Sequence, residues 1–550
     1  MNHWPYRLGL TIAALVLAAA GAAAAPASTA DQLMQQADAA LYATARQYFP
    51  SDDAQAPQKR IFRLTRDQLD ATVASLLPMY VGQSAKDALP RDALQTNYEY
   101  AELLSLNQAN ITALSKWIGA IAARVRTNPA GVITCPAGAS ATDCLAAQAR
   151  AFVIRAFRGD AAEEKIAQFT KFFLASVQSV GLNQATGDLV EVVLNSPAFL
   201  FRKELDVTRT GRLAPAQLLA AITYTATDVP PEALNLGSDR AAQYLRSGTD
   251  AAATIGAVVA SRESRDKLLR FFTSWLEIKE PGEFTISQKV YPEFDAKLSA
   301  AMRAETRQFL RTQLAKPAPR LTDITQATHS YVPKSLAAIY AGQASTSTGT
   351  ALVPIDPQQR LGIFSHAAVL ASHSGPTDTR PIKRGVFWVR KVMCMEMEPP
   401  PPELHAKLYE LTGATERQRI EQSTGGPACI GCHKVINPFA FFQENWDALG
   451  RWRTLDNGVP IDASTMINFL DEEPARTETA VDALKLLTNS MAFKQCFVRQ
   501  LFRFYMGRNE EPSDDPLLRG IFFQFAYQDR QDILTALQML ASSDRIVRRQ

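Results

Sequence analysis

The sequence predicts a mainly α-helical protein that is built from several domains. Apolar side chains recur at helical spacing in residues 264–278 and again in residues 292–311. The chain has 550 residues, of which 47% are hydrophobic and 21% are charged. These proportions are typical of globular proteins, and domains usually have about 100 to 150 residues, so we expect several helical modules in succession.

The two periodic segments are predicted to be amphipathic helices. Residues 292–311 begin with a proline, which suits the first turn of a helix. Apolar stripes of this kind are usually core rather than cofactor contacts. Glu305 falls on the apolar face of the second helix, where an ion pair with an arginine is favoured over a role as a catalytic base. The stripes consist of Leu268, Leu269, Phe272, Trp275 and Leu276, and of Phe294, Leu298, Met302 and Phe309.

The N-terminus has the pattern of a secretory signal. Arg7 precedes an apolar run over residues 8–20, and small residues follow as far as residue 30. We expect cleavage between residues 24 and 30, although an uncleaved membrane anchor is the structural alternative. No later stretch approaches the ~20 apolar residues of a membrane span, so no stable membrane insertion is expected after cleavage. The predicted location is periplasmic or secreted.

Breaks in the helical pattern predict the domain boundaries. Prolines and glycine interrupt it at residues 128–131 and 317–319, residues 345–350 are typical of a linker, and the four prolines at 399–402 predict a stiff polyproline II spacer. We therefore expect a signal peptide at 1–30, helical modules at 60–128, 129–205 and 206–345, a module with the motif described next at 346–455, and a C-terminal helical module at 456–550.

The run Cys429-Ile430-Gly431-Cys432-His433 is the C-x-x-C-H signature for covalent attachment of a c-type haem. Cys429 and Cys432 would bind the porphyrin as the cofactor-binding residues, and His433 would be the iron ligand. A zinc site would need about four ligands, yet the other Cys and His residues are scattered singly. A redox dithiol is a further alternative, but the motif does not lie in a βαβ pattern. We expect one covalent haem c in a cytochrome-like C-terminal segment.

The other four cysteines are consistent with export. Cys135 and Cys144 flank a short loop and predict a local disulfide in an oxidising compartment. Cys394 and Cys496 remain, and a bond between them would join the C-terminal helices to the haem region. Buried free thiols are the alternative, and the sequence leaves the connectivity open.

Several short motifs resemble those of large secreted proteins, first noted in planctomycetes, that string together consecutive domains of unknown function. The resemblance covers essentially residues 60–550 and is closest in the C-terminal part. Each motif is short, but the order of the motifs is specific. These lie at residues 61–68, 194–202, 291–295 and 381–385, at Cys394, at the haem motif, at residues 437–438, 444–447 and 450–453, and from Cys496 to residues 507–508.

The resemblance implies a secreted, mostly helical, cytochrome-like protein without a well-defined reaction. Such proteins often carry an additional N-terminal cytochrome c module, and this chain departs from them because it has no second C-x-x-C-H. The family pattern assigns no role to His366 and His373. A position in a haem pocket and a position at a helix end or in the core are the two interpretations of these histidines.

Two function classes follow. In the first, the protein is a haem-dependent oxidoreductase or electron-transfer component that works with a redox partner protein or a small organic substrate. In the second, it is a secreted scaffold in which the motif is structural, because a plain cytochrome needs only about 100 residues. Without residues 1–30 the chain has 57 basic and 55 acidic residues, which argues against nucleic acid as a partner. Candidates for the sixth iron ligand are Met393, Met395, Met397 and Met466.

Overall fold

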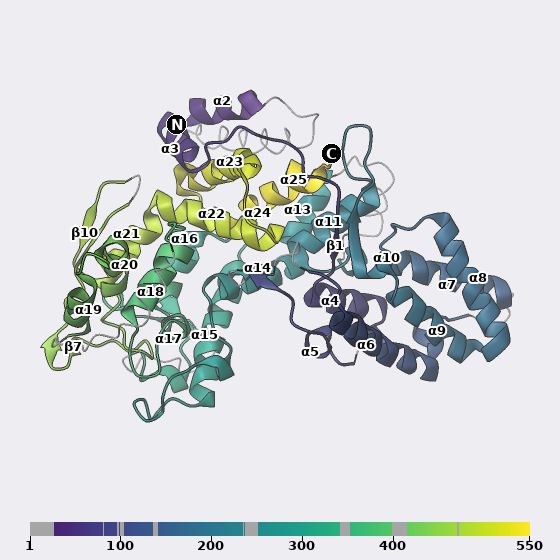
Figure 1. The fold of residues 1–550 in the computed structure, drawn as a ribbon, viewed down its shortest axis with the longest axis horizontal. Coiled ribbons are helices and arrows are strands. Elements are labelled where there is room, and N and C mark those ends of the chain that lie inside the picture. Colours follow the sequence, from purple (N-terminus) through teal and green to yellow (C-terminus); the bar gives the residue numbers. More distant parts are fainter. Residues whose placement is uncertain are drawn as a thin grey trace, which may run out of the picture.

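The computed structural model describes residues 27–80, 82–95, 98–99, 104–135, 141–234, 236, 251–340, 352–398, 415–469 and 472–550. It confirms the mainly α-helical, multidomain prediction (Figure 1). Three predicted features fall wholly or largely outside the described residues, namely the signal peptide up to residue 26, the linker at 345–350 and the proline spacer at 399–402.

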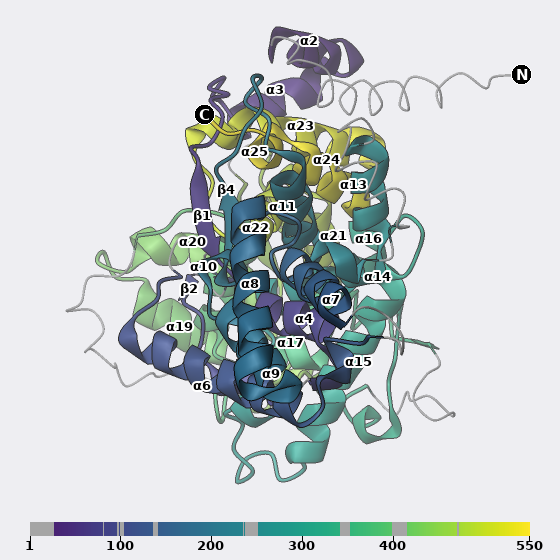
Figure 2. The same ribbon diagram turned by 90° about the vertical axis from the view of Figure 1, so that its right-hand side faces the viewer.

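The N-terminal lobe has a hydrophobic core of its own, formed by residues between Leu64 and Tyr224. Helix α9 packs against both α6 and α8, and α7 packs against α8. These helices occupy the right side of Figure 1, and Figure 2 shows α8 and α9 facing the viewer. The helices of this lobe are α4 (Arg66–Leu76), α5 (Ala85–Ala88), α6 (Gln108–Thr127), α7 (Ala141–Ala156), α8 (Glu163–Val180), α9 (Leu182–Leu194) and α10 (Pro197–Leu200).

The other helices share a second, larger core, except α19, whose Ile420 packs in a small separate cluster with Ala440 and Phe441. In Figure 1 the C-terminal helices cross the upper middle of the molecule, and α2 and α3 lie above α23. These helices are α2 (Ala27–Ala37), α3 (Ala39–Tyr48), α11 (Pro215–Thr227), α13 (Ala251–Ala260), α14 (Arg262–Trp275), α15 (Ala296–Leu314), α16 (Leu321–Thr325), α17 (Ala367–Ser372), α18 (Pro381–Phe387), α19 (Glu416–Thr424), α20 (Ile430–Phe441), α21 (Ala480–Asn489), α22 (Met491–Met506), α23 (Asp515–Ala526), α24 (Ile533–Ser542) and α25 (Asp544–Val547).

Among the described residues, the strands form only antiparallel pairs. The pair of β1 and β4 matters most for the architecture, because its register places Arg60 opposite Glu204 and joins distant parts of the chain. Glu204 is fully buried and also binds Arg549 near the C-terminus. The pairs are β1 (Arg60–Arg63) with β4 (Phe201–Glu204), β2 (Leu94–Gln95) with β3 (Tyr98–Glu99), β5 (His329–Ser330) with β6 (Val353–Pro354), β7 (Leu455–Asp456) with β8 (Val459–Pro460), and β9 (Thr465–Ile467) with β10 (Ala475–Thr477).

Local interactions set the ends of the two helices that periodicity predicts. Helix α15 begins at Ala296 rather than at residue 292, because the Asp295 carboxylate accepts a hydrogen bond from Leu298 N at 2.6 Å. Helix α14 ends at Trp275, and Glu277 follows in the left-handed region at φ 52°. The predicted break at 128–131 is also present, since α6 ends at Thr127.

Candidate haem-attachment site

The C-x-x-C-H motif lies at the start of helix α20. Helix α19 ends at Thr424, and the four residues 425–428 (Gly-Gly-Pro-Ala) separate it from Cys429, the N-cap residue of α20. Backbone hydrogen bonds from Cys429 N and Ile430 N to Gly426 O, both 2.9 Å long, close this turn. Local backbone hydrogen bonds therefore hold the turn in which the motif begins.

Cys429 and Cys432 are both free thiols, whereas the other four cysteines are in disulfides. Cys429 is half-buried and Cys432 is exposed. Residues three apart at the start of a helix lie on neighbouring positions of its surface. The two sulfur atoms are consequently unpaired and accessible, which is the state that attachment to a porphyrin requires.

A hydrogen-bond relay orients His433. Its Nδ1 lies 3.0 Å from Asn437 Oδ1, and Asn437 Nδ2 donates to Thr424 Oγ1 at 3.1 Å. Because the amide nitrogen of Asn437 is used as a donor, its oxygen is the acceptor, and Nδ1 of His433 carries the proton. Nε2 is then the nitrogen with a free lone pair, as in metal-ligating histidines whose other nitrogen donates a hydrogen bond. The two thiols and this imidazole fit covalent haem.

One to two turns beyond the motif, α20 packs against α18. Ile436 and Ala440 are buried, and a Cβ on Gly385 of α18 would lie 2.8 Å from the Ile436 backbone oxygen and side chain. Only glycine permits this close approach of the two helices. The helix that begins with the motif is therefore packed closely against α18.

Aromatic residues that follow the motif lie in the protein core. Phe439 is 2% exposed, and Phe442 and Trp446 are fully buried. Phe442 packs edge-on against Trp388, and Trp446 does the same against Trp452. These rings therefore belong to the protein core.

The four candidate methionines differ in position. Met393 is buried, and Met395 and Met397 are partly buried against the main core. Met466 is 45% exposed at the centre of β9, a strand that contacts α20.

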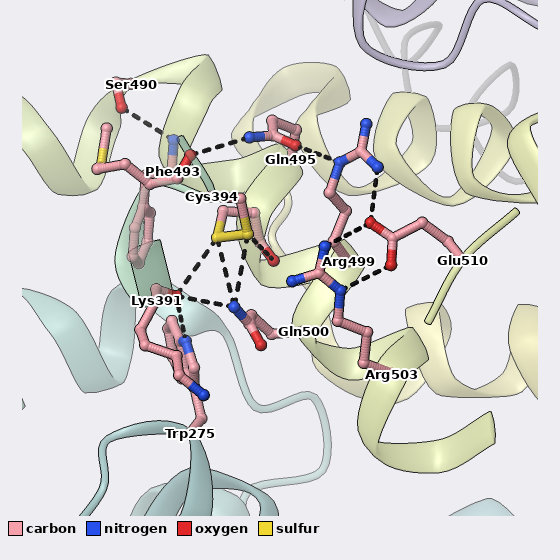
Figure 3. Close-up of a disulfide and its surroundings, with 12 residues drawn as sticks. Trp275, Lys391, Cys394, Ser490, Phe493, Gln495, Arg499, Gln500, Arg503 and Glu510 are labelled. Carbon is pink, nitrogen blue, oxygen red and sulfur yellow. Dashed lines mark hydrogen bonds and ion pairs between the residues drawn. A yellow bond between two sulfur atoms is a disulfide. The ribbon is translucent and has the colours of Figure 1, made fainter. Parts of the chain in front are cut away.

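The disulfide between Cys394 and Cys496 links the C-terminal helix α22 to the region that supports the motif (Figure 3). Cys394 follows a π-helical turn at Trp388–Val392 that contacts α20. Gln500 Nε2 and Trp275 Nε1 both donate to Lys391 O, at 3.1 and 2.7 Å, beside the disulfide. The bond between Cys135 and Cys144 is also present, so both disulfides considered from the sequence are confirmed.

His366 and His373 flank helix α17 at its two ends and are 1% and 3% exposed. His366 Nδ1 lies 3.2 Å from Thr306 Oγ1, and His373 Nε2 lies 3.0 Å from Leu276 O. Burial lowers the pKa of each imidazole to about 3, with a further contribution from Arg360 at His366. The structure therefore places both histidines in the helix-end and core positions of the second interpretation.

Glu305 is buried among hydroxyl groups rather than paired directly with an arginine, so that expectation is wrong. Its Oε1 accepts hydrogen bonds from Ser330 Oγ at 2.7 Å and Tyr340 Oη at 2.6 Å. Arg360, which would be the natural partner, instead donates to backbone oxygens, including that of Ile339 at 2.8 Å. Burial raises the pKa of Glu305 to about 7, although these hydrogen bonds and the charge of Arg360 oppose the rise.

We expect Glu305 to make stability depend on pH. Its pKa is higher in the folded chain than the ordinary 4.5, so its contribution is fully present below about pH 4.5 and is lost as pH rises through about 7. Glu305→Gln keeps an acceptor oxygen but cannot ionise. The variant should therefore gain about 3 kcal/mol in unfolding free energy relative to wild type between pH 4.5 and 8, measured by urea unfolding at each pH.

The control for this measurement is Glu473→Gln, at an exposed position. The unfolding free energy of this variant should change with pH in the same way as that of wild type. If unfolding free energy depends on pH in the same way for wild type and Glu305→Gln, the expected ionisation of Glu305 is contradicted.

Two further features of the described residues concern metals and membranes. No group of three or more His, Cys, Asp or Glu side chains within the described ranges is placed to hold a metal ion. Of the helices that the structure describes, none is both long and apolar enough to cross a membrane.

Comparison with known families matches two parts of the chain. Residues 213–341 match PSD4, described as a protein of unknown function (DUF1592), and residues 360–456 match PSCyt3, described as a protein of unknown function (DUF1588). The second match includes Cys429, Cys432 and His433. No curated protein and no solved structure matches the chain. The two matches support the resemblance to proteins made of consecutive domains of unknown function.

Proposed function

We propose that this chain is an exported c-type haem protein that transfers electrons, either to a partner protein or in the oxidation or reduction of a small organic substrate. The observation that carries the proposal is the pairing of two free thiols with an oriented imidazole at one helix start. The predicted signal at residues 1–30 and the two disulfides support a periplasmic or secreted location.

Cys429 and Cys432 would attach the haem. Each thiol would add across one porphyrin vinyl group, with its sulfur on one carbon and its hydrogen on the other, so no oxidant would be required. When bound, haem supplies a one-electron couple whose potential depends on its axial ligands and surroundings. His433 Nε2 would be the proximal ligand, held in place by Asn437 and Thr424.

Met466 is a candidate for a second residue that would bind the haem iron. Its exposure on β9 beside α20 leaves its thioether free of the core packing that surrounds Met393. A thioether ligand raises the reduction potential of a haem.

The test of redox function is replacement of His433. His433→Ala should keep the thioether bonds but lose the axial nitrogen, so the visible spectrum and the reduction potential should change. Electron transfer with the native partner should fall to background. Lys434→Ala, at the exposed next position of the same helix, should keep all three properties.

A different outcome would favour the scaffold function. If a folded, haem-bearing His433→Ala protein supports its host's pathway as well as wild type does, the haem is structural and the redox proposal fails.

A further inference from the structure

A polar cavity of about 240 Å³ lies between the two hydrophobic cores. Its walls come from β1, β2, β3, β4, α4, the C-terminal end of α11, α14, the end of α22, and α25. Figure 1 places β1, α4 and α14 near the middle of the molecule, away from α19 and α20 at the left. No residue of α19 or α20 lines the cavity, so it is separate from the proposed haem site.

Positive charge predominates in the wall. Its cationic side chains are Arg60, Arg63, Arg202, Lys267 and Arg270, and its acidic side chains are Asp67, Glu99 and Asp228. Glu204 pairs with Arg60 and Arg202, and Asp92 pairs with Arg63, so these three cations are largely neutralised. Arg270 is therefore the cation that can attract an anion into the cavity.

Asp228 binds two of these cations, and its carboxylate already accepts three hydrogen bonds from protein groups. It accepts hydrogen bonds from Lys267 Nζ at 2.7 Å, Arg270 Nη2 at 2.6 Å and Gln68 Nε2 at 2.9 Å. Burial would raise the pKa of Asp228, but the charges of Lys267 and Arg270 outweigh it and hold the pKa at about 2. Arg270 remains 37% exposed, so its guanidinium is available to a further anion.

Glu99 cancels little of this charge in mildly acidic solution. Its pKa is raised to about 7, first by burial and then by the negative charges of Asp92, Asp67 and Asp228. Below that pH it carries a proton.

Three hydrogen-bond donors in the lining residues have no acceptor. Among the residues that the structure describes, the Tyr505 hydroxyl and the Nε atoms of Arg63 and Arg202 are buried without a hydrogen-bond partner. Tyr505 is only 4% exposed. A buried polar group without a partner costs about 1 to 3 kcal/mol, so such groups point to a ligand or water that supplies acceptor oxygens.

Aromatic rings complete the wall. Phe62, Phe504 and the ring of Tyr505 line the cavity, and the Arg60 and Arg202 guanidiniums lie 4.4 and 4.9 Å from the centre of the Phe62 ring. These rings give the cavity an apolar side, which suits the apolar body of an organic ligand better than an inorganic anion. The volume is below the ~300 to 1,000 Å³ typical of pockets for drug-sized molecules, so the ligand is small.

We propose that this cavity binds a small organic acid, with its carboxylate on Arg270 and the Tyr505 hydroxyl and its apolar body against Phe62 and Phe504. A guanidinium fork matches the two oxygens of a carboxylate, which explains a site rich in arginine.

The test is calorimetric titration of the full exported protein with benzoate at pH 6. Benzoate should bind, and benzamide, its neutral isostere, and inorganic phosphate should each bind at least about tenfold more weakly. Arg270→Gln and Tyr505→Phe should each weaken benzoate about tenfold or more. Tyr505→Phe keeps the ring and so tests the site even if Arg270→Gln fails to fold.

Arg451→Gln is the control, because Arg451 is also 37% exposed and is paired with carboxylates, those of Asp447 and Glu293, outside the cavity. It should bind benzoate as wild type does. The proposal is overturned if benzoate does not bind up to about 10 mM, a range that includes weak millimolar affinities. Equal binding of benzamide or phosphate, or unchanged affinity in Tyr505→Phe, also overturns it, and none of these results bears on haem attachment.

Discussion

Replacing Cys429 and Cys432 together with alanine is expected to abolish covalent haem. Both thiols are free, and each would form one thioether. In a host with cytochrome c assembly, a denaturing gel stained for haem peroxidase activity should show a band for wild type and none for the double variant. Both residues lie at the exposed start of α20, so the fold should persist, with an unchanged circular dichroism spectrum.

The matched control removes a different pair of cysteines. Cys135→Ala with Cys144→Ala also deletes two sulfur atoms, but in α7 and the segment before it, and should leave the stained band intact. A haem-stained band in the Cys429 and Cys432 variant would contradict the assignment.

The second large effect is expected from the Cys394–Cys496 disulfide. It closes a sequence separation of 102 residues, against 9 for Cys135–Cys144. In the loop-entropy model, the long loop contributes about 5 kcal/mol to stability and the short loop about 3 kcal/mol. Replacing Cys394 and Cys496 with alanine should therefore lower the denaturant midpoint more than replacing the other pair.

Tryptophan fluorescence can follow this unfolding, because Trp275 is fully buried and donates to Lys391 O beside the disulfide (Figure 3). Equal midpoints for the two double variants would contradict the loop-length argument. That result would indicate that the long loop is already restrained in the unfolded chain.

Local patterns in the sequence predicted the features that depend on local structure. The apolar stripe of α15 follows helical periodicity, and the haem motif lies within one turn and its flanking residues. The relay from His433 to Asn437 also has a local signal, because the two residues are four apart on one helix. That spacing could have identified Asn437 as the residue that orients the ligand.

Contacts between distant segments could not be predicted in the same way. Glu305 is held by Ser330 and Tyr340, whose hydroxyls carry no pattern that marks them as partners of a carboxylate. Likewise, nothing in the sequence around Glu204 indicates that Arg549 completes its ion pair. Both depend on tertiary packing, which sets the partners of a buried charge.

The pairing of Cys394 with Cys496 was open for a related reason. Four cysteines outside the motif allow three connectivities, and spacing alone does not select one. The structure selects it because the turn after α18 packs against α22.

A pyridine haemochrome assay on the purified wild-type protein decides whether the mature chain carries one covalent haem. We expect one haem per chain, a spectrum characteristic of thioether-linked haem, and haem that stays with the protein in acidified acetone. Covalent attachment is contradicted if folded protein, exported from a host with cytochrome c assembly, contains no haem. It is also contradicted if the protein releases its haem into the acidified acetone.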